Sequence, residues 1–324
     1  MHLEILLNNL SNPTLLFFLL GILASSVKSD LEIPQQTAKF ISIYLLFSIG
    51  FKGGQELQHA QPGLEIVIGV MLGVIIASAI PLYAFFLLKR RLGVSNAGAV
   101  AAAYGSVSAI TFITAVSYLE LNGLTFDGYM VAVMAIMELP AIVVAFFLMQ
   151  VYESQKDTPL RFGHLVRHSL TNGSVLMLLG SLAIGFLSDS RQAEGIKPFT
   201  TDIFKGFLAI FLLEMGMVTA KRFSAFRQYG WFALCFALLV PCFNGCLVAW
   251  GSQYMVHSPG NRFIFAILAA SASYIAAPTA MRIAVPEANP ALSLGAALGV
   301  TFPFNVVVGI PLYHHAARWL AGAP

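Results

Sequence analysis

Long apolar stretches separated by short polar connections dominate the sequence. A helix needs about 20 apolar residues to cross the hydrocarbon core of a bilayer, and ten stretches approach that length. The predicted spans are 13–27, 38–51, 64–88, 98–121, 129–152, 173–187, 203–220, 231–254, 263–284 and 292–320. The longest polar stretch, 153–171, divides them into five and five. The pattern therefore predicts an all-α polytopic membrane protein with ten transmembrane helices.

An internal repeat relates the two sets of spans. Because five is an odd number, the second set must enter the membrane from the opposite side, so the repeats are inverted. Inverted repeats are typical of secondary transporters. We expect a first five-helix repeat over 1–152, a cytoplasmic connecting loop over 153–171 and a second repeat over 172–324. The matched segments, in the same order in both halves, are 20–24, 39–51, 105–108 and 138–144, and 179–183, 205–217, 271–274 and 301–307.

Lysines and arginines near the span ends predict the orientation, because they tend to stay on the cytoplasmic side. With the N-terminus outside, eleven lie on the cytoplasmic side, namely Lys28, Lys89, Arg90, Arg91, Lys156, Arg161, Arg167, Lys221, Arg222, Arg227 and Arg282. Five lie on the outer side, namely Lys52, Arg191, Lys197, Arg262 and Arg318. This bias predicts that both termini lie outside.

The composition supports a membrane protein and excludes other classes. Hydrophobic residues make up 58% of the 324 residues and charged residues only 10%, against roughly a quarter charged in soluble domains. The net charge of +3 is scattered, without the basic stripe of a nucleic-acid-binding protein, so no nucleic-acid partner is expected. Cys235, Cys242 and Cys246 fall in one apolar segment and are expected to be small core residues rather than a disulfide framework. The N-terminal sequence lacks the features of a cleaved signal peptide, so the first apolar segment is expected to remain as a span.

Motifs of ATP hydrolysis and metal-dependent catalysis are missing from the sequence. It contains no HExxH, no glycine-rich phosphate loop and no aspartate-rich pyrophosphate motif, which argues against ATP-driven pumping and zinc-dependent proteolysis. We therefore expect a transporter rather than an enzyme. A channel and a membrane enzyme remain the alternatives from other functional classes.

Two spans carry small and hydroxyl residues at equivalent mid-span positions, 101–111 and 269–279. A helix interrupted there would expose backbone N–H groups at the start of its second half, where the helix dipole is positive and serine is a favoured cap. Two such ends at the midplane would form an anion site, and the freed carbonyls with hydroxyl oxygens suit a sodium ion. Pro278 supports an interruption in the later span. The alternative is that small residues merely let the helices pack closely.

Ionisable and amide side chains inside the spans are further candidates, because such residues are costly in a bilayer and often functional. Glu138 could coordinate a cation, carry a proton or be paired with a lysine. Glu214 could instead reach the interface. Lys39 and Lys205 lie near the starts of equivalent spans, where snorkelling to the interface is the ordinary explanation. Asn305 could form a hydrogen bond between helices.

These motifs resemble those of the sodium-dependent bicarbonate transporters first described in cyanobacteria, and especially of their shorter bacterial relatives. The resemblance covers nearly the whole chain and implies two inverted five-helix repeats with two broken helices crossing at the midplane. It also implies a homotrimer in the bacterial inner membrane that takes up bicarbonate together with sodium. The shared motifs are SNPTL at 11–15, IGFKGG at 49–54, GSVSAIT at 105–111, MGM at 215–217, APTAMR at 277–282, PEANP at 286–290 and GIPL at 309–312.

The same resemblance implies a site between the two broken helices. Sodium would lie beside the anion, with Thr111, Glu138 and Tyr274 as candidate ligands; Tyr274 stands where the cyanobacterial members carry an acidic residue. Another small monoanion, such as a carboxylate, is the alternative substrate. A PII-like regulator is a further candidate partner, although the central loop is much shorter than in the cyanobacterial members. The implied anion-binding residues are Gly105, Ser106, Val107 and Ser108 in the first half and Ser271, Ala272 and Ser273 in the second.

Overall fold

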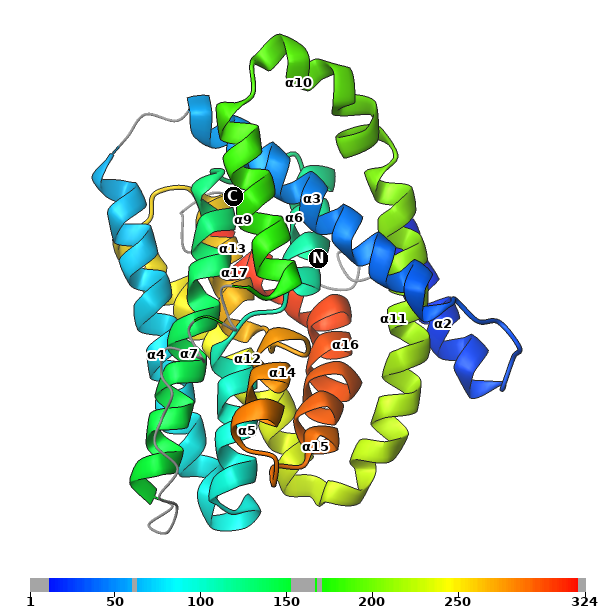
Figure 1. Ribbon diagram of the computed structural model, residues 1–324, viewed down its shortest axis with the longest axis vertical. Helices are drawn as coiled ribbons and strands as arrows, with labels where there is room; N and C mark the ends of the chain where they lie inside the picture. The colour runs from blue at the N-terminus through cyan, green and yellow to red at the C-terminus, as the bar shows by residue number, and fades with distance from the viewer. Residues whose placement is uncertain (1–11, 60–62, 153–166, 168–170, 320–324) are drawn as a thin grey trace.

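The computed structural model describes residues 12–59, 63–152, 167 and 171–319, and every regular element in these ranges is a helix (Figure 1). The all-α prediction is therefore confirmed. Most of the predicted connecting loop, 153–166 and 168–170, lies outside the described residues. Among the described residues, five helical stretches are long and apolar enough to cross a membrane: Leu64–Leu92, Val94–Leu121, Tyr129–Tyr152, Ser190–Tyr254 and Pro290–Arg318. Pro13–Ser26 and Gly173–Leu187 are shorter apolar helices.

The helices agree closely with the apolar stretches of the sequence, and most differ from them only at the ends. In the first half they are α2 (Pro13–Ser26), α3 (Gln35–His59), α4 (Leu64–Leu92), α5 (Val94–Gly105), α6 (Ala109–Leu121) and α7 (Tyr129–Tyr152). The second half begins with α9 (Gly173–Leu187), α10 (Ser190–Lys197), the π-helix η1 (Pro198–Asp202), α11 (Phe204–Phe226), η2 (Arg227–Tyr229) and α12 (Gly230–Gly251). It continues with η3 (Ser252–Tyr254), α13 (Pro259–Ala270), α14 (Ala276–Ala284), α15 (Pro290–Leu294), η4 (Gly295–Thr301), α16 (Phe302–Phe304), η5 (Asn305–Gly309) and α17 (Ile310–Trp319).

Four helices, α2, α3, α9 and α11, form what we call the scaffold bundle. In it α2 packs along α11 and α3 packs along α9, so each pair joins one helix of each half of the chain. Glycines permit the close approach of the backbones. A Cβ atom on Gly21 would lie 2.0 Å from the Leu213 carbonyl oxygen, and one on Gly54 would lie 2.1 Å from that of Leu182. The Gly21 and Gly54 positions are therefore explained by helix packing.

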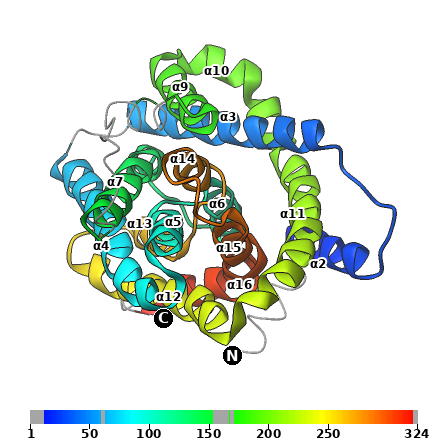
Figure 2. The same ribbon diagram turned by 60° about the horizontal axis from the view of Figure 1, so that its bottom comes forward.

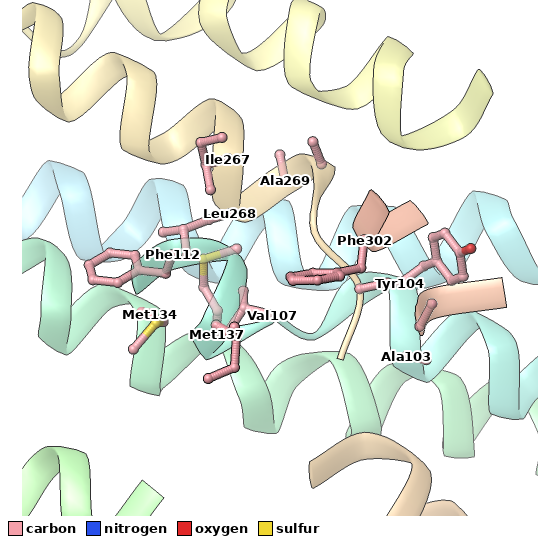
Figure 3. Close-up of a cluster of buried hydrophobic side chains, with 14 of the residues drawn as sticks. Ala103, Tyr104, Val107, Phe112, Met134, Met137, Ile267, Leu268, Ala269 and Phe302 are labelled. Atoms are coloured by element: carbon pink, nitrogen blue, oxygen red, sulfur yellow. The ribbon is translucent and has the colours of Figure 1, made fainter. Parts of the chain in front are cut away.

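The remaining long helices form a second unit, which we call the core bundle and which comprises α4 to α7 and α12 to α17. Figure 2 shows α3 and α11 passing along the outside of this compact bundle, with α5 near its centre. The alanines 101 to 103 of α5 are fully buried, and α5 packs against α4 and α7. Around the end of α5 lies an apolar cluster that includes Val107, Met137 and Phe302 (Figure 3).

Outward-facing side chains of both bundles are strongly apolar. Leu23 and Leu176 of the scaffold bundle and Ile75 and Trp231 of the core bundle are each more than half exposed. Such a surface suits hydrocarbon rather than water, because a bilayer core offers no partners for polar groups. The lengths, the composition and this outward apolar surface together describe a multi-pass membrane protein. The three cysteines of α12 are free, but Cys235 is exposed and Cys242 and Cys246 are half-buried, so the prediction that they are core residues is wrong.

The last predicted span is helical but irregular, since α15, α16 and α17 alternate with the π-helical segments η4 and η5. π-Helical turns are uncommon and occur frequently at functional sites. Here Asn305, the first residue of η5, donates from Nδ2 to the Ala270 carbonyl oxygen at 2.7 Å. It also accepts from the Tyr313 hydroxyl at 3.3 Å. The predicted hydrogen bond between helices is therefore confirmed, and it ties this span to the end of α13.

Candidate functional site

The fourth predicted span is interrupted where the sequence indicates. α5 ends at Gly105 and α6 begins at Ala109, and we call residues 106–108 the first junction. Ser108 caps α6, because its Oγ accepts from the Thr111 N–H at 3.2 Å. Gly105 is required at the end of α5, since a Cβ there would lie 2.5 Å from Pro81 Cδ and 3.0 Å from Ala141 Cβ. The serine cap and the glycine thus fix the position of the break.

The ninth predicted span is interrupted in the same way. α13 ends at Ala270 and α14 begins at Ala276, and we call residues 271–275 the second junction. The Ser273 Oγ accepts from the Ala277 N–H at 3.3 Å, which satisfies one of the donors that a helix start leaves without a partner. Pro278 lies in the first turn of α14, where a missing N–H breaks no helical hydrogen bond.

The two junctions contact each other directly. The Ser108 N–H donates to the Ser271 Oγ at 3.0 Å, and the Ser273 N–H donates to the Ala103 carbonyl oxygen at 2.7 Å. Residues 163 positions apart in the chain are thereby held in fixed register. The N–H groups of Ser108 and Ser273 are consequently used within the protein, and what these two residues offer to a ligand is their hydroxyl groups.

A cavity of about 330 Å³, which we call the junction cavity, opens beside both junctions. It brings together Val107, Ser108 and Ser273 from the predicted anion site with Glu138 and Tyr274 from the predicted sodium site. It also includes the first residues of α6 and α14, where helix starts favour anions. Its lining residues are Ser42, Leu46, Val107, Ser108, Ala109, Ile110, Glu138, Ser174, Ser273, Tyr274, Ile275 and Ala276.

Two buried oxygens in this cavity lack a protein partner. Glu138 Oε2 and the Tyr274 hydroxyl make no hydrogen bond in the described part of the chain, although the Tyr274 hydroxyl lies beside Ser108. Among the described residues that line the cavity there is no lysine, arginine or histidine. Unsatisfied buried polar atoms are rare and call for a ligand or a functional role. An oxygen-rich wall with one carboxyl and no basic group is suited to a small cation.

Five of the predicted site residues lie outside the lining of the junction cavity, and the contacts of three show why. Gly105 packs against Pro81. Ser271 supports the crossing, because its Oγ accepts from Ser108 and donates to the Leu268 carbonyl oxygen at 3.0 Å. Thr111 is buried in the first turn of α6. The five residues are Gly105, Ser106, Ser271, Ala272 and Thr111.

Two polar lining residues were not predicted from the sequence, namely Ser42 of α3 and Ser174 of α9. Both belong to the scaffold bundle, so the cavity lies between the two bundles. A single serine in an apolar helix carries no distinctive signal, because serine commonly serves helix packing in membranes. Only the packing of α3 and α9 against the junctions identifies them.

A second cavity of about 390 Å³, which we call the distal cavity, lies between α2, α6, α11 and α17. The predicted repeat pairs these helices with α9, α14, α3 and α7, which contribute to the junction cavity. The distal cavity includes neither junction. Its lining residues are Asn12, Thr14, Leu15, Thr114, Ser117, Tyr118, Leu212, Val306, Ile310 and Pro311.

Comparison with known proteins gives one family. The model of the Na+-dependent bicarbonate transporter superfamily matches residues 13–318, which include both junctions and every residue that lines the junction cavity. No curated protein matches the sequence significantly.

Proposed function

The chain belongs to the Na+-dependent bicarbonate transporter superfamily, and on this premise we propose that it takes up bicarbonate together with sodium across the inner membrane of a bacterium. The observation that carries the proposal is the junction cavity, which is lined by residues of both helix starts and by Glu138, whose Oε2 has no hydrogen-bond partner in the described part of the chain. Another small monoanion, such as a carboxylate, would use the same groups.

The anion binds at the starts of α6 and α14. The positive ends of both helix dipoles favour a single negative charge, and the hydroxyls of Ser108 and Ser273 supply directed hydrogen bonds. Because the junctions are hydrogen-bonded to each other, both helix starts keep their spacing when the core bundle moves. The starts of α6 and α14 therefore move together, and the anion site keeps its shape.

The co-transported sodium binds beside the anion, at Glu138 and Tyr274. The unpaired Glu138 oxygen supplies a hard oxygen ligand, and the Tyr274 hydroxyl supplies a second. Sodium neutralises the carboxylate and so removes its repulsion of the incoming anion. This order explains how the two solutes are coupled, since the anion binds well only after the cation. Thr111 has no part in this version of the sodium site, because it does not line the cavity.

Transport proceeds by alternating access between the two bundles. Ten spans in two inverted repeats, with both termini outside, give two equivalent routes to the junctions from opposite membrane faces. The distal cavity supports the proposal of two routes, because it lies between the predicted counterparts of the helices that form the junction cavity. The homotrimer and a PII-like regulator stay predictions from the family resemblance.

The test is uptake of labelled bicarbonate by proteoliposomes that contain the purified full-length protein, under an inward sodium gradient. We expect uptake to be driven by sodium and to fall to the background level when choline replaces it. Uptake that ignores sodium would contradict the coupling. Strong uptake of acetate or formate without any of bicarbonate would assign the alternative substrate.

A further inference from the structure

A cluster of charged residues lies away from the junctions, at the end of the molecule where α3 and α6 finish and α11 begins. Lys52 is in the last two turns of α3, and Lys205 is in the first turn of α11. These two scaffold helices are counterparts in the predicted repeat and run in opposite directions. An inverted repeat therefore brings a lysine from each half to the same membrane face, which is the outer one in the proposed orientation.

Glu120 of the core bundle lies between the two lysines. Its Oε1 is paired with the Lys52 ammonium, and its Oε2 lies 4.0 Å from the Lys205 Nζ. Exposed fractions are 39% for the Lys52 side chain, 49% for Lys205 and 31% for Glu120, so water and small solutes reach all three. Lys205 is thus engaged by a specific carboxylate, which the snorkelling explanation does not require.

Lys52 and Glu120 line a cavity of about 280 Å³, which we call the lysine cavity. Lys205 is not part of its lining and reaches the cluster through Glu120. Its wall includes three hydroxyl residues, Ser48 of α3 and Thr200 and Thr201 of the π-helix η1. The Ser48 side chain is only 1% exposed, and its hydroxyl has no hydrogen-bond partner in the described part of the chain. An unsatisfied buried hydroxyl next to a lysine is an additional donor that a ligand could use.

The charge of this cavity depends on Glu120. The other acidic neighbour of Lys52 is Glu56, which lies beyond the apolar part of α3 and whose pKa is raised to about 7 by burial, with Lys52 opposing the shift. Burial therefore favours the neutral form of the Glu56 carboxyl group. Asp127, which also acts on Glu56, accepts from the Asn261 amide at 2.6 Å. Once Glu120 moves away, the two lysines exceed the negative charge that remains beside them.

We propose that Lys52 and Lys205 form a capture site for a small oxyanion with one negative charge, and that the Glu120 carboxylate occupies this site in the present conformation. Glu120 belongs to the core bundle and both lysines belong to the scaffold bundle. Movement between the bundles, on which this inference rests and which belongs to the proposed function, withdraws the carboxylate and leaves both lysines to an incoming anion. A planar carboxylate and bicarbonate present the same pair of oxygens, so Glu120 acts as an internal substitute for the substrate.

The competing explanation is that these ion pairs only fasten the two bundles together. The two explanations differ in whether removing Glu120 and removing a lysine change transport in the same direction or in opposite directions. A fastening is broken equally by removing Glu120 or a lysine, so the variants would change transport in the same direction. In a capture site, losing a lysine weakens binding of the anion, whereas losing Glu120 removes a competitor of the anion.

The first experiment compares Lys52→Gln, Lys205→Gln and Glu120→Gln in the proteoliposome assay. We expect each lysine variant to raise KM for bicarbonate by about threefold to tenfold with little change in kcat, because only local attraction of the anion is lost. Glu120→Gln should lower KM or leave it unchanged. Lys52→Arg, which keeps the positive charge, should restore most of the affinity. A shift of KM in the same direction for all three variants would overturn the proposal.

A second experiment works without transport and so separates this proposal from the proposed function. Purified Glu120→Gln protein is acetylated with an amine-reactive reagent in sodium chloride, sodium bicarbonate or sodium acetate of equal ionic strength. Mass spectrometry of the peptides then measures the modification of each lysine. We expect bicarbonate and acetate to slow the acetylation of Lys52 and Lys205 by about threefold or more, whereas chloride does not.

Lys197 is the matched control in the same sample, since its side chain is 61% exposed and it pairs only with its helix neighbour Glu194 among the described residues. Acetate is included because it cannot form a carbamate with lysine. Equal reactivity of Lys52 and Lys205 in all three salts would overturn the capture site even if bicarbonate is transported. Protection without any sodium-coupled uptake would instead leave the capture site standing and contradict the proposed function.

Discussion

In the predicted repeat, the junction cavity and the distal cavity are built from counterpart helices of the two halves, yet only the junction cavity includes the two junctions. Glu138, whose Oε2 has no partner, lines the junction cavity. Its counterpart in the repeat is Thr301, which donates to the Ala237 carbonyl oxygen at 2.7 Å and is bonded to the Tyr104 hydroxyl at 2.7 Å. The Thr301 hydroxyl is therefore satisfied by the protein itself. The predicted repeat thus relates two similar cavities, and a few side chains decide which one holds charge.

A second difference concerns the direction of access. The junction cavity includes Ser42 and Ser174, which lie near the starts of α3 and α9. In the proposed orientation these starts face the cytoplasm. At the outer end, Glu120 joins the core bundle to both lysine-bearing scaffold helices. If the proposed function and orientation hold, this arrangement corresponds to a transporter open toward the cytoplasm and closed outside.

The largest expected effect comes from removing the charge that distinguishes the two cavities. Glu138→Gln should lower sodium-driven bicarbonate uptake by about 100-fold, because the cation loses its charged ligand and coupling depends on it. Uptake at several sodium concentrations measures the effect. Glu214→Gln is the matched control, since Glu214 is also in a span but does not line the junction cavity. Equal losses in both variants would contradict a specific role for Glu138.

The next largest effect is expected at Gly105, the last residue of α5, whose counterpart in the predicted repeat is Ser271. Gly105→Ala places a Cβ against Pro81 and Ala141, so we expect a loss of stability of about 1–3 kcal/mol through overpacking. Thermal unfolding of the purified protein in detergent measures it. Gly180→Ala in α9 has no heavy atom within 4 Å of the added Cβ and should be neutral or slightly stabilising. Similar melting temperatures for both variants would rule out the tight contact at the first junction.

A smaller effect is expected at the two serines that face the anion. Ser108→Ala and Ser273→Ala should each raise KM for bicarbonate by about threefold to tenfold, because one hydrogen bond contributes about 0.5–1.5 kcal/mol. Each variant also loses a helix-start contact, so folding is checked by size-exclusion chromatography. If both variants fold and transport with unchanged kinetics, the anion binds elsewhere.

The smallest effect is expected on the scaffold side. Ser42→Ala and Ser174→Ala should each change KM by about twofold, since these hydroxyls line the cavity without belonging to a helix start at the junctions. Ser117→Ala is the control, because Ser117 lines the distal cavity, and its hydroxyl is buried without a partner. A larger effect of Ser117→Ala than of the other two would place the substrate route on the distal side.

Much of the fold could be predicted from the sequence for reasons of local chemistry. Apolar length marks the helices, and the bounds of α7 and α9 agree with the predicted spans at both ends. The two interruptions were also found, because Ser108 is a favoured cap and Gly105 is a small residue at a helix end. These signals act within a few residues and need no knowledge of the partners.

The residues that line the junction cavity were harder to predict. A stretch such as 105–108 was nominated as a whole, yet only Val107 and Ser108 line the cavity. Backbone rotation within the junction turns neighbouring side chains in different directions, and sequence spacing does not give that rotation outside a regular helix. Lys205 was likewise given an interfacial role, and its contact with Glu120 depends on α6 reaching the same end of the molecule as α11.

Amino-acid order alone determined the helical class and the two places where helices break, since each follows from hydrophobicity, helix capping or small side-chain size along a short segment. The inverted repeat stays a prediction. The packing of the halves settled which residues share a space. It joined Ser42, Ser108, Glu138, Ser174 and Tyr274 around one cavity and left Thr111 outside it. Those residues come from helices of both halves, and their meeting depends on contacts between segments more than 100 residues apart, which no local pattern encodes.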